Sequence, residues 1–261
     1  MDFQQKDLRD LRRAKALLEN PGIAAKLTNL IGIPIEKGFK MLPANWHAKI
    51  GEIAQVALTK AAHAAIFTMK NTPGEASSDF WHKFAVAATG GVGGFFGLPA
   101  MSMELPVSTT IMLRSIADIA RSEQEDIASE AARLACIEVF ALGGPTSNDD
   151  ASESGYFAVR AALAQSITRA TEYIAEKGVV EEGAPALVRL IILVAQRFSI
   201  QVSEKAAAQA IPAIGAAGGS IINTLFIDHF QDIARGHFIV RRLERKYGAE
   251  MVATAYRNRC K

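Results

Sequence analysis

The 261-residue sequence lacks several features that would point to a fold or an activity. It has only two cysteines, Cys136 and Cys260, which excludes a disulfide framework and a four-cysteine zinc site. Its formal net charge is only +2, from 29 basic and 27 acidic residues, so no overall attraction for nucleic acid is expected. No apolar run follows the charged amino terminus, which predicts a chain without a secretory signal and a cytoplasmic location.

The sequence also lacks the alternation of apolar and polar residues that is typical of strands. Apolar residues instead recur at three- and four-residue intervals, which predicts helices over 43–70, 104–122, 124–142, 156–176, 185–210 and 212–246, and a short one after Gly248. With 49% apolar residues the chain can bury a sizeable core. We expect an all-α fold, a single helical bundle with two glycine-rich uncharged helices packed in its centre or against a membrane.

The charges are unevenly distributed along the chain. Residues 1–83 include 12 basic and 8 acidic residues, and residues 84–234 include 9 basic and 17 acidic residues. The remainder, 235–261, has 8 basic and 2 acidic residues. We therefore distinguish an amphipathic helical region at 1–83 from a core region at 84–261, within one domain overall. The polar, acidic stretch at 145–155 is typical of a mobile loop. The two basic ends and the acidic middle either face different surroundings or face each other.

Two long segments carry no formal charge, residues 84–103 and residues 206–227. About 20 apolar residues are needed to span a bilayer core, so length permits a span, although alanine and glycine contribute much of each segment. Several of their glycines are four residues apart, a spacing that lets two helices approach closely. These helix-packing or ligand-contact candidates are Gly90, Gly93, Gly94, Gly97, Gly215 and Gly219. Close packing in a soluble core and a membrane-apposed hairpin both fit this pattern.

Ionisable and polar residues beside the uncharged segments are candidates for function, because such groups are costly to keep in a core or a membrane. They are Glu104, Arg114, Asp118, Arg121, Asn223, Asp228, His229 and Asp232. For Arg114, Asp118 and Arg121 an ordinary intrahelical charge cluster is the competing interpretation. No third ligand converges with His229 and Asp232, so we expect no metal and no cofactor. We also expect helical histidines of this kind to be solvated, and Cys136 to be a buried, inert thiol.

A second candidate surface is basic. Arg241, Arg242, Arg245 and Lys246 cluster on the last predicted long helix, and basic residues beside a membrane contribute about 1 kcal/mol each. We expect these four residues to lie against anionic headgroups or an acidic partner surface.

Several motifs of this chain resemble those of the EcsC family of bacterial proteins. They are the glycine tract at 90–100, Glu104-Leu105-Pro106, the stretch at 113–120, Glu125-Asp126, the stretch at 140–144, residues 211–216 and Tyr247-Gly248. The resemblance extends over about residues 84–248, with looser similarity before that. It implies association with a membrane and an accessory role in transport or envelope processes, and it implies no catalytic residue.

The sequence thus predicts a non-enzymatic, membrane-associated helical protein on the cytoplasmic side of the bacterial inner membrane. Its partner would be the membrane surface or an inner-membrane protein, with no nucleic acid, and its oligomeric state is left open. A soluble helical protein that binds a lipid or another apolar ligand is the alternative, and a metal-dependent hydrolase is the third.

If the glycine-rich helices pack closely, a leucine within them forces the backbones apart. Gly94→Leu and Gly219→Leu should each lower the free energy of unfolding by about 1–3 kcal/mol in urea denaturation. Gly155→Leu, in the acidic loop, is the control and should have little effect. Equal effects of all three substitutions would contradict the close packing.

Overall fold

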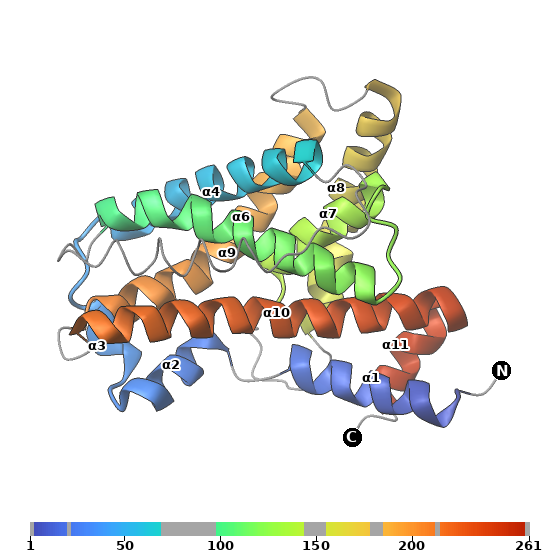
Figure 1. Ribbon diagram of the computed structural model, residues 1–261, viewed down its shortest axis with the longest axis horizontal. Helices are drawn as coiled ribbons and strands as arrows, with labels where there is room; N and C mark the ends of the chain where they lie inside the picture. Colours follow the sequence, from blue (N-terminus) through green and yellow to red (C-terminus); the bar gives the residue numbers. More distant parts are fainter. Residues whose placement is uncertain are drawn as a thin grey trace.

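The computed structural model describes residues 3–19, 22–68, 98–143, 155–177, 185–211 and 215–258. These residues form helices and one 3-10 turn and contain no strand, so the predicted all-α fold is confirmed (Figure 1). The elements are α1 (Gln5–Leu18), α2 (Ile23–Ile31), α3 (Ile35–Phe39), α4 (Trp46–Thr68), α6 (Leu98–Ser122), α7 (Glu130–Glu138), η1 (Val139–Ala141), α8 (Gly155–Lys177), α9 (Pro185–Gln209), α10 (Gly215–Tyr247) and α11 (Ala249–Asn258).

Long helices that lie side by side form the body of the bundle. Helix α4 packs against both α6 and α9, and α10 lies beside α6 with α1 along its other side (Figure 1). Helices α6 and α10 run in the same direction, because Gln231 bonds to Ser115 and Arg242, further along α10, bonds to Glu123. The apolar starts of α6 and α10 are consequently at the same end of the molecule.

Residues with special backbone conformations end the helices. Gly32, Gly143 and Gly248 have φ angles of 68°, 72° and 88°, which favour glycine and stop α2, η1 and α10. The helix predicted over 124–142 is shorter than expected, because Gln124 has a positive φ and the chain turns before α7 begins. The Oγ of Ser129 then accepts a hydrogen bond from the amide of Ala132 and caps α7.

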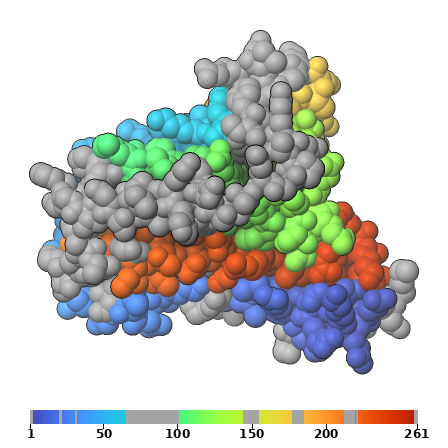
Figure 2. Space-filling model, viewed as in Figure 1, coloured from blue at the N-terminus to red at the C-terminus, as the bar shows by residue number. Residues whose placement is uncertain are grey.

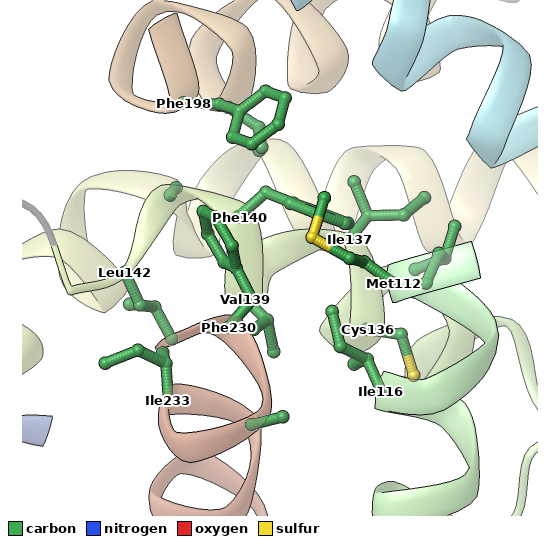
Figure 3. Close-up of a cluster of buried hydrophobic side chains, with 14 of the residues drawn as sticks. Met112, Ile116, Cys136, Ile137, Val139, Phe140, Leu142, Phe198, Phe230 and Ile233 are labelled. Atoms are coloured by element: carbon green, nitrogen blue, oxygen red, sulfur yellow. The ribbon is translucent and has the colours of Figure 1, made fainter. Parts of the chain in front are cut away.

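Aromatic and aliphatic side chains from α6, α7, η1, α9 and α10 meet in the core (Figure 3). The ring of Phe140 lies 5.1 Å from that of Phe198 and 5.2 Å from that of Phe230, so one short turn joins two long helices. Cys136 is buried beside them, and burial raises the pKa of its thiol to about 12. The prediction of a buried thiol is confirmed, and this pKa keeps it protonated at neutral pH.

The closest helix contacts that the structure describes involve glycines other than those predicted. A Cβ on Gly38 would lie 2.0 Å from the carbonyl oxygen of Ala207, and one on Gly236 would lie 3.0 Å from that of Ala14. Backbone therefore packs on backbone between α3 and α9 and between α10 and α1. Of the predicted glycines, those at 90–97 lie outside the described residues, Gly215 begins α10, and Gly219 is half-buried in its second turn. The predicted packing of the two glycine strips stays a prediction.

The second uncharged segment is not one helix. It comprises the last turn of α9 and the first half of α10, so these residues do not form a single straight span. By length and composition, one helix of the described residues could cross a membrane, namely α9, with a mean hydropathy of 1.5. However, 44% of its most apolar 18-residue stretch is buried, and core helices of soluble proteins can have the same length and composition.

Substitution of Gly38 tests the contact between α3 and α9. Gly38→Ala should lower the free energy of unfolding by about 1–3 kcal/mol, because the methyl group overlaps the Ala207 carbonyl and backbone must move. Gly51→Ala in α4 is the matched control, since a Cβ there meets nothing within 4 Å and should stabilise the helix by about 0.5–1 kcal/mol. Urea denaturation of both variants measures the difference, and similar effects would refute the close contact.

Candidate functional site

One end of the bundle exposes large apolar side chains. Leu30 closes α2, Met41 follows α3, Met103 and Val107 lie one turn apart in α6, and Ile221 lies in the second turn of α10. Their exposed fractions are 50%, 52%, 78%, 52% and 47%, among the highest for large apolar residues of the described chain. We call these five residues the apolar end. Figures 1 and 2 show the starts of α6 and α10 on the same side of the molecule, and α2 and α3 lie on that side in Figure 1.

Cations accompany the apolar end. Lys37 and Lys40 are exposed on and beside α3, and neither has an ion pair among the described residues. Glu36 is an exposed carboxylate on the same short helix. The surface thus combines exposed aliphatic side chains with two exposed ammonium groups that have no ion pair within the described ranges, a composition typical of segments that lie at a membrane interface.

A buried ion pair lies where α6, α9 and α10 meet at this end. The Lys205 side chain is 1% exposed, and its Nζ donates to Glu104 Oε1 at 2.6 Å. The same Nζ lies 4.9 Å from the centre of the Phe226 ring, a cation–π contact. The preceding residue, Glu204, is also buried, and burial raises the pKa of its carboxyl to about 7 although Ala24 contributes a backbone hydrogen bond. Glu104 was among the residues predicted from the sequence, whereas Glu204 and Lys205 were not.

The eight predicted polar residues do not converge on one site. Asp118 pairs with Arg121 at 2.8 Å on an exposed face of α6, as expected for an intrahelical pair, and Arg114 also interacts within the chain. Asp232 pairs with Arg235 at 3.0 Å and lies 3.8 Å from Lys26. The remaining members behave separately: Glu104 bonds to Lys205, Asp228 is exposed, Asn223 is half-buried, and His229 is buried.

The helical histidines of α10 are buried, which corrects the expectation that they are solvated. His229 is 1% exposed beside Gly143, and burial, followed by the charge of Lys26, lowers the pKa of its imidazole to about 4. His229 is therefore neutral at physiological pH. Within the described ranges no group of three histidine, cysteine or carboxylate side chains is placed to hold a metal ion.

The four basic residues predicted to face a membrane have carboxylate partners within the chain. Arg241 and Arg245 both bond to Glu125, the former at 2.8 Å. Arg242 bonds to Asp10 at 2.8 Å and to Glu123 at 2.7 Å. Lys246 bonds to Asp7 at 2.7 Å. The acidic surface that these cations face is therefore formed by α1 and the turn at 123–125, and these contacts lend no support to a membrane-facing role.

The pKa values of the paired carboxyls reflect these contacts. A hydrogen bond from Lys246 lowers the pKa of Asp7, with further help from Tyr247 and Arg242. Burial raises the pKa of Glu125, but the guanidinium groups of Arg241 and Arg245 lower it by more. Both carboxylates thus stay ionised at neutral pH and hold α1 and the turn against the end of α10.

A buried polar cluster that was not predicted from the sequence lies between α7, α8 and α10. Arg160 forms two bonds with Glu244, at 2.7 and 2.9 Å, and lies 3.3 Å from the hydroxyl of Tyr156. That hydroxyl lies 3.0 Å from His237 Nδ1, and His237 Nε2 lies 3.7 Å from Glu138. Because burial raises the pKa of Tyr156, its hydroxyl keeps its proton, and the tautomer of His237 decides which of the two groups donates. The only signal in the sequence is polar residues placed among apolar neighbours.

The pKa shifts in this cluster predict a pH dependence of stability. Burial raises the pKa of Glu138 to about 7 and lowers that of His237. The folded state thus binds more protons at Glu138 than the unfolded state between the ordinary carboxyl pKa, 4.5, and about 7. This contribution to stability is fully present below that range and is lost as the pH rises through it.

Glu138→Gln removes the titration and keeps a neutral side chain of similar shape. Relative to this variant, the wild type should lose up to about 3 kcal/mol of unfolding free energy between pH 4.5 and pH 8. Urea denaturation of both proteins across this range gives the difference and cancels the contribution of His237 that the two share. A difference that is constant with pH would refute the raised pKa.

Comparison with known proteins extends the similarity of this chain beyond its glycine-rich motifs. Neither a curated protein nor a solved structure matches the chain. The sequence model of the EcsC protein family matches residues 5–243. The match therefore includes α1 with Asp7 and Asp10, which lie in the region where the motifs showed only looser similarity. Because this match covers most of the 261 residues, the chain belongs to the EcsC protein family.

Proposed function

We propose that this protein is a non-enzymatic, membrane-associated protein that docks by its apolar end on the cytoplasmic face of a bacterial inner membrane. The observation that carries the proposal is the exposure of Met103 and Val107. Met103 is the last residue of the uncharged segment 84–103, and Val107 lies one helical turn further along. Large apolar side chains gathered on one surface are typical of interaction sites. An accessory role in a transport or envelope process at that membrane is part of the same proposal.

The size of the apolar end favours peripheral and reversible binding. Complete burial of a large aliphatic side chain is worth about 1.5–3 kcal/mol, so five half-exposed ones contribute about 1 kcal/mol each. Their sum of about 5 kcal/mol is similar to the binding energy of a single myristoyl chain, which anchors a protein only marginally. Lys37 and Lys40 add about 1 kcal/mol each where the membrane carries anionic lipid.

Orientation follows from the parallel course of α6 and α10. With their starts toward the bilayer, the opposite ends of these helices and their ion pairs with α1 point into the cytoplasm. The charged groups of Arg242, Asp10 and Glu123 then stay in water and keep their mutual contacts. No charge has to cross the hydrocarbon in this arrangement.

Flotation with liposomes tests the proposal. Met103→Gln with Val107→Gln should weaken binding to vesicles of phosphatidylcholine and phosphatidylglycerol by about 30-fold, because two inserted apolar groups are lost. Val188→Gln, an exposed apolar position in the first turn of α9, is the matched control and should leave binding unchanged.

Circular dichroism of the double variant should show an intact helical fold, since both positions are exposed. Wild-type protein that does not float with any vesicle, or a double variant that floats as well as the wild type, would contradict docking by the apolar end.

A further inference from the structure

Lys205 is a deeply buried cation that pairs with Glu104, the residue next to Met103 of the apolar end. Its ammonium group has three N–H donors, and one of them bonds to Glu104. The group also makes a cation–π contact with the Phe226 ring. Seven neighbouring positions of α9, from Gln201 to Ala208, are also buried, so Lys205 is enclosed by the helices around α9. A buried ammonium group needs an anion beside it, since an unpaired one is strongly destabilising.

The anion that Lys205 has is not itself enclosed. The Glu104 side chain is 32% exposed, and it follows Met103, the most exposed apolar residue of the described chain. If another anion took its place on Lys205, Glu104 could turn into water and no uncompensated charge would remain in the interior. The cost of such an exchange is therefore much lower than the cost of breaking the pair.

A further polar group lies near this point on α10. Asn223 precedes Phe226 by one turn, and its Oδ1 is buried without a hydrogen-bond partner among the described residues. A buried acceptor without a partner is uncommon in proteins and calls for an explanation. The protonated oxygen of a singly charged phosphate monoester would satisfy it.

We propose that Lys205 is the anchor for the phosphate monoester of an anionic lipid headgroup, which displaces Glu104 at the apolar end. A phosphate monoester carries more negative charge than a carboxylate and has three acceptor oxygens, so it competes well for one ammonium group. The acyl chains would extend from Met103 and Val107 into the bilayer, and in this respect the inference rests on the proposed docking of the apolar end.

Titration with dihexanoyl phosphatidic acid below its micelle concentration tests the anchor without a membrane. Glu104→Gln removes the competing carboxylate and should bind this lipid about tenfold more tightly than the wild type by isothermal titration calorimetry. Lys205→Met should lose binding altogether. Dihexanoyl phosphatidylcholine, whose phosphate carries a bulky cation, should bind to none of the three proteins.

The double variant Glu104→Gln with Lys205→Met controls for loss of binding that is caused by unfolding. Replacement of both members of a buried pair is often neutral for stability, so this protein should fold even where a single variant does not. It should fail to bind phosphatidic acid. Binding by the double variant, or no gain in affinity for Glu104→Gln, would overturn the proposal.

Two further experiments distinguish a lipid headgroup from free phosphate, and anion binding at Lys205 from docking by the apolar end. Inorganic phosphate that binds Glu104→Gln as tightly as the lipid does would overturn the assignment to a lipid headgroup. Liposome flotation of Lys205→Met reports on docking by itself. Loss of phosphatidic acid binding with intact flotation on phosphatidylcholine is the expected result, whereas a wild type that binds the soluble lipid and no vesicle would contradict only the proposed docking.

Discussion

The ion pairs that neutralise the cations at the end of helix α10 constrain how other segments pack against it. Its last three turns carry Arg241, Arg242, Arg245 and Lys246, and four carboxylates of α1 and the 123–125 turn bond to them. Single ion pairs at a surface contribute little, but here several charges share partners and two of the carboxylates are nearly buried. This network holds α1 against the end of α10, and further along their contact a Cβ on Gly236 would lie 3.0 Å from the Ala14 carbonyl oxygen.

The same constraint gives the molecule two dissimilar ends. Since α6 and α10 are parallel, the uncharged starts of both helices lie together, and so do their charged ends. The cations of α10 hold the fold together at one end, while aliphatic side chains remain exposed at the other. Membrane association is therefore proposed for the apolar end, with Lys37 and Lys40 as the cations available there.

Two polar clusters join helices in the interior, one around Arg160 and the other, around Lys205, at the apolar end. The bonds of Arg160 with Glu244 and of Tyr156 with His237 join α8 to α10, and the bond of Lys205 with Glu104 joins α9 to α6. Such groups contribute less to stability than apolar packing does, but they satisfy one another only in one arrangement of the helices. We regard specification of the helix register as their structural role, and a ligand-binding role is proposed for the second cluster alone.

The sequence by itself determined the helical fold, the family and the local details that depend on near neighbours. The 3.6-residue periodicity, the glycines that end helices at Gly143 and Gly248, the pair of Asp118 with Arg121 and the buried state of Cys136 all follow from residues close together in the chain. Tertiary structure decided which charges meet, because Lys205 and Glu104 are 101 positions apart and Arg242 and Asp10 are 232 apart. Periodicity shows which face of a helix is apolar, but it does not show which other helix covers that face. For that reason the sequence left open whether the cations of α10 face anionic headgroups or an acidic surface, and it predicted solvated histidines. Packing paired these cations with carboxylates of the same chain and buried the histidines.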